Sequence, residues 1–249
     1  MRFGANLSML FQELPFLDRF EAARDAGFQS IEVLFPYDMA AKDILGALNA
    51  AGLPLALINT PPPNWTGGDR GFAAIPGGED RFRHDFKRAL RYAEVLGAEI
   101  VHIMSGNAEG PVARRTFVDN PNWAVAQAPK QRMTIEPLNP QDMPGYFLNS
   151  FDLAAGVLDD VATPNLALQF DTYHAHMITG DVMDCWNRFG HLAGHIQIAG
   201  VPGRHEPVGG EIDYPAFFER LQQDGYKRWI MGGYRPAADT RAGLGCLTL

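Results

Sequence analysis

Helix-like and strand-like segments alternate along the chain, and short glycine phrases separate several of them. The helical pattern is clearest before Gly97, where apolar residues recur three or four positions apart: Phe82, Phe86, Leu90 and Ala93. Glycine suits the end of such a helix because it lacks the Cβ atom that makes left-handed backbone costly. The same phrase recurs, each time before an apolar run, as Ala26-Gly27-Phe28, Ala51-Gly52-Leu53, Leu96-Gly97-Ala98 and Asp224-Gly225-Tyr226.

The apolar runs predict eight β-strands, most of them separated by an interval long enough for a helix. We expect them at residues 2–6, 31–35, 55–58, 100–104, 133–138, 166–171, 196–199 and 229–231. Strands that alternate with helices imply parallel pairing and right-handed crossovers. Eight such units in 249 residues predict an α/β fold, a single-domain (β/α)8 TIM barrel over residues 1–249, rather than an open doubly wound sheet. No glycine-rich nucleotide-binding motif follows any of these strands.

One proline conflicts with this alternation, because Pro121 falls inside the expected fourth helix. Proline in a helix interior costs about 3 kcal/mol and disfavours helical backbone at the preceding residue. We therefore expect this helix to be broken or kinked, with Asn120 capping a new helix that starts at Pro121.

Two loops are longer than the usual connection between a strand and a helix of a barrel. They span residues 60–71, which include Trp65, and residues 200–211. Both follow the carboxyl ends of strands, the face on which barrel enzymes carry their active sites. We expect both loops to cover a pocket.

The charge balance excludes some classes of partner. The chain carries 21 Lys and Arg against 29 Asp and Glu, a net charge of −8, and has no basic cluster, which argues against nucleic acid or a membrane as the main partner. Its two cysteines, Cys185 and Cys246, are too few for a disulfide framework or a structural zinc site. No apolar run approaches a membrane span and the N-terminus is unlike a signal peptide, so we expect a cytoplasmic protein.

Polar side chains stand where the predicted strands end: Asn6, Asn59, His102, Glu136, Asp171 and Gln197. Barrel interiors are packed with apolar side chains, so buried carboxylates there need a partner or a cation. The two carboxylates and one amide oxygen of Glu136, Asp171 and Gln197 are hard ligands that suit Mg²⁺ or Mn²⁺. A carboxylate at a strand end also serves as a helix cap or in an ion pair, so spacing alone leaves these alternatives open.

Several phrases resemble hydroxypyruvate isomerases, which belong to the xylose-isomerase-like barrel superfamily. They are Arg2-Phe3-Gly4-Ala5-Asn6-Leu7-Ser8-Met9-Leu10-Phe11, Phe35-Pro36-Tyr37-Asp38, Gly68-Asp69-Arg70-Gly71, Ile135-Glu136-Pro137-Leu138-Asn139, Pro144-Gly145-Tyr146-Phe147-Leu148 and residues 204–213. The resemblance covers essentially the whole chain. It implies that Glu136, Asp171 and Gln197 bind one divalent metal ion, and that His174 and Arg204 contact the substrate.

The resemblance also implies a reaction, the interconversion of hydroxypyruvate and tartronate semialdehyde through an enediolate. A divalent cation would stabilise charge on the substrate oxygens while carboxylates such as Glu136 move the proton. Arg204 would grip the substrate carboxylate, and His174 would hydrogen-bond the polarised oxygen. His102 either lines the pocket or is a hydrogen-bonded core histidine. The expected partner is thus a small hydroxy-carbonyl acid, and a homo-oligomer stays open.

The eighth strand departs from the family pattern. The family carries a second glutamate there, both metal ligand and acid–base group, and this position aligns with Gly233, which has no carboxylate within four residues on either side. We expect weaker metal binding, with water in the vacant position, and impaired activity. Glu206 and Glu211 of the loop at residues 200–211 are candidates to replace the glutamate in part.

Three other functions stay open beside this isomerase. The same barrel and metal would serve a sugar epimerase or isomerase that acts on a ketose. Without the strand-eight glutamate, the chain could instead be a barrel that binds a ligand without turnover. A DNA-repair endonuclease would share the architecture, but the acidic net charge argues against it.

Overall fold

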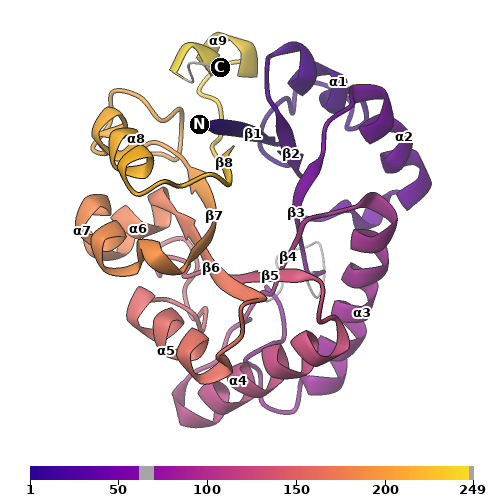
Figure 1. The fold of residues 1–249 in the computed structure, drawn as a ribbon, viewed down its shortest axis with the longest axis vertical. Coiled ribbons are helices and arrows are strands. Elements are labelled where there is room, and N and C mark those ends of the chain that lie inside the picture. Colours follow the sequence, from indigo (N-terminus) through magenta and orange to yellow (C-terminus); the bar gives the residue numbers. More distant parts are fainter. Residues whose placement is uncertain (62–69, 247–249) are drawn as a thin grey trace.

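The computed structural model describes residues 1–61 and 70–246, and within them eight parallel strands form a closed barrel (Figure 1). Each strand pairs with the next along the chain, and β1 pairs with β8 to close the ring. The strands are β1 (Arg2–Asn6), β2 (Ser30–Glu32), β3 (Leu55–Asn59), β4 (Ile100–His102), β5 (Arg132–Ile135), β6 (Leu166–Asp171), β7 (Ala193–Ile198) and β8 (Trp229–Gly232). The predicted (β/α)8 barrel is confirmed.

Helices surround the barrel and cover its outer face (Figure 1). The α-helices are α1 (Asp18–Asp25), α2 (Ala41–Ala51), α3 (Glu79–Leu96), α4 (Gly110–Gln127), α5 (Phe151–Val161), α6 (Thr172–Thr179), α7 (Val182–Phe189), α8 (Tyr214–Gln223) and α9 (Thr240–Gly243). Short 3-10 helices are η1 (Pro36–Asp38), η2 (Gly190–Leu192) and η3 (Leu244–Cys246).

The glycine phrases end helices as predicted. Gly52 and Gly97 terminate α2 and α3 in the left-handed conformation, with φ of 66° and 67°. Gly27 and Gly225 also have positive φ, 91° and 70°. A residue with a Cβ atom would be strained at these turns, which is why a local sequence signal located them.

The predicted apolar face of α3 packs inward. Phe82, Phe86 and Ala93 are buried, and Leu90 is half-buried. Trp123 of α4 meets the rings of Phe82 and Phe86 at centroid distances of 6.2 and 5.9 Å, both edge-on. Aromatic packing therefore joins α3 to the middle of α4.

The fourth helix is continuous, so the expected break at Pro121 is wrong. α4 runs through Pro121, and both Asn120 and Pro121 are buried. The side-chain amide of Asn120 donates to the backbone carbonyl of Ala73 at 2.9 Å instead of capping a new helix. These tertiary contacts, with the aromatic packing of Trp123, hold the helix together although proline cannot donate its backbone hydrogen bond.

Two further features concern cysteine and hydropathy. Cys185 is buried and takes part in no disulfide, and burial raises the pKa of its thiol to about 12. Among the described helices, none has the length and apolar character needed to cross a membrane.

Part of the loop at residues 60–71, including Trp65 and the Gly68-Asp69 phrase, lies outside the described residues.

Candidate active site

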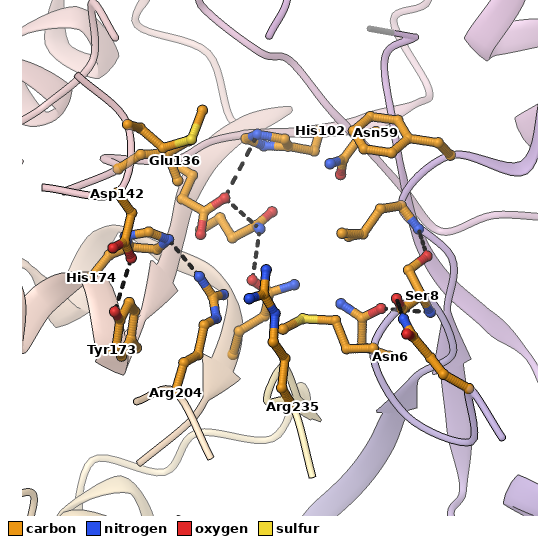
Figure 2. A pocket seen from close by; sticks show the side chains of 18 of the residues that line it. Asn6, Ser8, Asn59, His102, Glu136, Asp142, Tyr173, His174, Arg204 and Arg235 are labelled. Atoms are coloured by element: carbon orange, nitrogen blue, oxygen red, sulfur yellow. Dashed lines mark hydrogen bonds and ion pairs between the residues drawn. The ribbon is translucent and has the colours of Figure 1, made fainter. Parts of the chain in front are cut away.

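A cavity of about 1230 Å³ opens where the carboxyl ends of the strands meet (Figure 2). Five of the six polar residues expected at the strand ends line it: Asn6, Asn59, His102, Glu136 and Gln197. The sixth, Asp171, is buried and forms an ion pair with Arg204, which lines the cavity. Parallel strands bring residues far apart in the sequence to one mouth, because all their carboxyl ends face the same way.

Three side chains in this mouth have the spacing of a metal site. Glu136, Asp171 and His174 are buried, and each offers one ligand atom such that these atoms lie within 4.8 Å of one another. Glu136 directly follows β5, Asp171 is the last residue of β6, and His174 lies in the first turn of α6. The two predicted carboxylate ligands therefore converge.

One oxygen of the Glu136 carboxylate is hydrogen-bonded, and the other has no hydrogen-bond partner. Its Oε2 accepts a hydrogen bond from Nε2 of Gln169 at 3.0 Å, whereas Oε1 is buried without any partner. Burial, and next the charge of Asp171, hold the pKa of Glu136 well above its usual range, while Arg204 opposes this shift. A buried carboxylate oxygen without a partner is costly unless a proton or a cation meets it.

Asp171 combines a helix cap with an ion pair. Its Oδ1 accepts from the backbone N–H of Tyr173 at 2.8 Å, and its Oδ2 accepts from Nη2 of Arg204 at 2.6 Å. Burial raises the pKa of Asp171, and Arg204 opposes the shift. The alternatives that spacing left open, a cap and an ion pair, are thus both realised in one residue.

Arg204 reaches into the cavity from the loop after β7 (Figure 2). Its Nε donates to the backbone carbonyl of Gly233 at 3.0 Å, and its Nη1 lies 2.9 Å from Nε2 of His174. The guanidinium therefore bridges Asp171, His174 and the position at which the second glutamate was expected.

The ring of His174 is oriented by the loop after β5. The backbone N–H of Asn139 lies 3.0 Å from Nδ1, and Nη1 of Arg204 lies 2.9 Å from Nε2, so each ring nitrogen faces a donor. Burial, followed by Arg204 and Arg70, holds the pKa of His174 well below its usual value, which favours the neutral ring. A neutral ring accepts at one nitrogen only, so one of these two contacts is not a hydrogen bond. The guanidinium of Arg204 only donates, and it offers a place for an acceptor oxygen beside this ring.

Gln197 and His102 complete the predicted set. Nε2 of Gln197 donates to the carboxylate of Glu32, and its Oε1 accepts from Nε2 of Gln169 at 3.2 Å. Nε2 of His102 lies 3.8 Å from Oε2 of Glu136. Burial, and next His195, lower the pKa of His102 to about 3, so this ring is neutral at the cavity wall.

The position of Gly233 faces the same group of side chains. A Cβ atom built there would lie 3.3 Å from Cβ of Gln197 and 3.7 Å from its Cδ. The two carboxylates considered as replacements point elsewhere: Glu206 accepts from the backbone N–H of Ala237, and Glu211 pairs with His176 at 3.0 Å. Neither lines the cavity, so the expectation that one of them replaces the glutamate is wrong.

The residues of the cavity wall that sequence reasoning missed include Asp142, Gln169, Tyr173 and Arg235. The hydroxyl of Tyr173 donates to Asp142 at 2.8 Å, and Arg235 points into the cavity beside Arg204 (Figure 2). Gln169 stands two residues before Asp171 in β6. Because side chains alternate across a strand, it shares the inward face with Asp171, and this period of two could have identified it.

The oxygen ligands present in the cavity fit a divalent cation. Glu136 offers an oxygen without a partner, and Asp171 and Gln197 offer further hard oxygens from β6 and β7. Among the described residues, none at the end of β8 carries a carboxylate, because Gly233 follows the strand. A cation held here would therefore have two charged ligands, Glu136 and Asp171, whereas a site with a glutamate after β8 would have three.

Comparisons with known proteins agree with this geometry. A family model described as xylose isomerase-like TIM barrel matches residues 20–248. The 2-oxo-tetronate isomerase of Cupriavidus necator is 47% identical, covering 99% of this chain and 97% of that protein. The hydroxypyruvate isomerase of Escherichia coli is 37% identical, covering 98% and 97%. A solved structure from Brucella melitensis, named AP endonuclease, family 2, has a TM-score of 0.94 and 42% identity, covering 98% of this chain and 96% of that one.

Proposed function

Because the chain belongs to the xylose isomerase-like TIM barrel family, we propose that it isomerises a small hydroxy-carbonyl acid, interconverting hydroxypyruvate and tartronate semialdehyde. The observation that carries the proposal is Oε1 of Glu136, which has no partner and is buried in a cavity that also holds the guanidinium of Arg204 and the ring of His174. A base without a partner beside a cationic donor suits a reaction that moves a proton while negative charge grows on an oxygen.

The cofactor is a divalent cation, Mg²⁺ or Mn²⁺, held by Glu136, Asp171 and Gln197. Their oxygens are the hard ligands that these ions prefer. When bound, the ion would stabilise negative charge that develops on the substrate oxygens.

Glu136 is the group that moves the proton. It takes a proton from C3 of hydroxypyruvate, which yields an enediolate, and returns it to C2, while the hydroxyl proton passes from the oxygen on C3 to the oxygen on C2. The raised pKa of Glu136 supports this role, because a carboxylate with a high pKa is a stronger base toward a carbon acid. With glycine at position 233, one carboxylate performs both transfers on one face of the substrate.

Arg204 and His174 bind the substrate oxygens. His174 hydrogen-bonds the oxygen that becomes negative, and Arg204 pairs with the carboxylate. Asp142 and Tyr173 close this side of the cavity through their own hydrogen bond. The position of Arg204 beside Glu136 favours an anionic acid over a neutral ketose as the substrate.

A four-carbon acid is the second candidate substrate. The relative from Cupriavidus necator, 47% identical, is named for 2-oxo-tetronate. A cavity of about 1230 Å³ has room for one more hydroxymethine group than hydroxypyruvate carries. The Brucella melitensis structure is named an endonuclease. A nuclease function is less favoured for this chain than an isomerase function, because a net charge of −8 opposes binding to a polyanion.

The test incubates the purified protein with hydroxypyruvate, with 2-oxo-tetronate, or with duplex DNA containing an abasic site, each with Mg²⁺ or Mn²⁺. Nuclear magnetic resonance follows the two acids, and gel electrophoresis follows the DNA. We expect isomerisation of an acid by the parent and none by Glu136→Gln. Faster turnover of 2-oxo-tetronate would select the four-carbon substrate. Conversion of neither acid by a protein that binds Mn²⁺ would overturn the isomerase proposal in favour of a barrel that only binds a ligand.

A further inference from the structure

We propose that Glu32 is a positioning residue, which turns the amide of Gln197 so that its oxygen faces the cation site. Glu32 ends β2, its side chain is 0% exposed, and it is hydrogen-bonded to Gln197, which lines the cavity. The inference rests on the proposed function, because it concerns the ligand set for the cation.

The carboxylate of Glu32 collects three donors from two strands. Nδ2 of Asn6 donates to its Oε1 at 2.8 Å, and Nε2 of His195 lies 2.8 Å from its Oε2. Nε2 of Gln197 donates to Oε1. Because Oε1 of Glu32 accepts this hydrogen bond, the side of the Gln197 amide that faces it is the NH₂ group. The amide oxygen then points to the opposite side.

A second side chain sets the same orientation from that opposite side. Nε2 of Gln169 donates to Oε1 of Gln197 at 3.2 Å and to Oε2 of Glu136 at 3.0 Å. Gln169 is itself oriented by Thr134, whose hydroxyl donates to its Oε1 at 3.0 Å. Two independent contacts, from β2 and from β6, therefore agree on the direction of the Gln197 oxygen.

A flipped Gln197 would lose both contacts. Its oxygen would face the oxygens of Glu32, and its NH₂ group would face the NH₂ group of Gln169. Groups that orient the ligands of a metal ion in this way typically change metal affinity 10- to 100-fold when they are removed.

The test measures Mn²⁺ affinity by calorimetry and by the electron paramagnetic resonance of free Mn²⁺, without any substrate. We expect Glu32→Ala to weaken Mn²⁺ binding by about 10- to 100-fold. The matched control is Asp85→Ala, which removes another buried carboxylate (4% exposed) that pairs with Arg81 on α3 and lies outside the cavity lining. This control should lower the melting temperature and leave Mn²⁺ affinity unchanged.

A pair exchange tests the contact itself and serves if Glu32→Ala does not fold. Gln197→Glu alone sets two carboxylates against each other, whereas Glu32→Gln together with Gln197→Glu restores a donor and an acceptor. We expect the double variant to melt above Gln197→Glu alone in the absence of metal, because two facing carboxylates are replaced by a donor and an acceptor. Equal melting temperatures in these two proteins, or equal Mn²⁺ affinity in Glu32→Ala and the parent, overturns the inference. A parent that binds no Mn²⁺ overturns the metal proposal itself, and this inference with it.

Discussion

Replacing Gly233 with glutamate should place a third carboxylate at the cation site. Gly233 follows β8 and has no positive φ, so its backbone admits a side chain. A Cβ atom there would lie 3.3 Å from Cβ of Gln197, so the neighbouring ends of β7 and β8 must move apart by a few tenths of an ångström. The variant should therefore fold, with its carboxylate beside Gln197 and Arg204.

The gain in metal affinity follows from charge. A carboxylate about 4 Å from a divalent ion interacts with it by about 8 kcal/mol at an effective dielectric constant near 20. Loss of a water ligand and of the new attraction between this carboxylate and Arg204 offsets most of that energy. We expect a net gain of about 2–3 kcal/mol, which corresponds to about 30- to 150-fold tighter binding. Without metal, three buried carboxylates repel one another, so the variant should melt below the parent and recover when Mn²⁺ is added.

Calorimetric titration with Mn²⁺ compares the parent, Gly233→Glu and Gly233→Gln. The glutamine variant has the same size and no charge, so it separates the effect of the carboxylate from that of the added atoms. Isomerase activity should rise together with affinity in Gly233→Glu alone. If this variant bound Mn²⁺ no more tightly than Gly233→Gln, position 233 would not face the cation site and the alignment of β8 would be wrong.

Two further substitutions test the energetics. Glu136→Gln should abolish isomerisation yet raise the melting temperature at neutral pH, by about 2–4 °C per kcal/mol, because burial and Asp171 disfavour the charged carboxylate. A carboxyl whose pKa is raised on folding costs stability as pH rises past its unfolded value, so the difference in melting temperature between variant and parent should widen as pH rises above about 4; a constant difference contradicts this. Pro121→Ala regains about 3 kcal/mol of helix propensity and loses about 1.6 kcal/mol for two buried methylene groups, so scanning calorimetry should detect about 1 kcal/mol of added stability. Its kcat should not change, and a lower melting temperature would mean that the packing of Pro121 outweighs the backbone effect.

Local signals in the chain were enough to predict the barrel. The ends of α2 and α3 at Gly52 and Gly97 depend on one left-handed residue each, and the helical face of α3 depends on a short period. Pro121 misled the same reasoning, because its cost is local whereas the contacts of Asn120 and Trp123 that hold α4 together come from other parts of the chain.

Residue types at the strand ends also predicted which side chains gather at the cavity. Glu136, Asp171 and Gln197 stand at or beside the carboxyl ends of three neighbouring strands, and parallel pairing requires these ends to meet at one mouth. The sequence alone also predicted that position 233 lacks a carboxylate, since a glycine has no side chain in any fold.

The orientations of the polar side chains could not be predicted from the sequence, because they depend on contacts that form only in the folded barrel. Which oxygen of Glu136 has no partner, which donor meets Nδ1 of His174 and which end of Gln197 faces the cavity all depend on contacts with Gln169, Asn139 and Glu32. Glu32 and Gln197 are 165 residues apart along the chain, and they meet only because the barrel closes. Periodicity reports which side of a strand a residue occupies, whereas hydrogen bonds across the barrel decide how its side chain is turned.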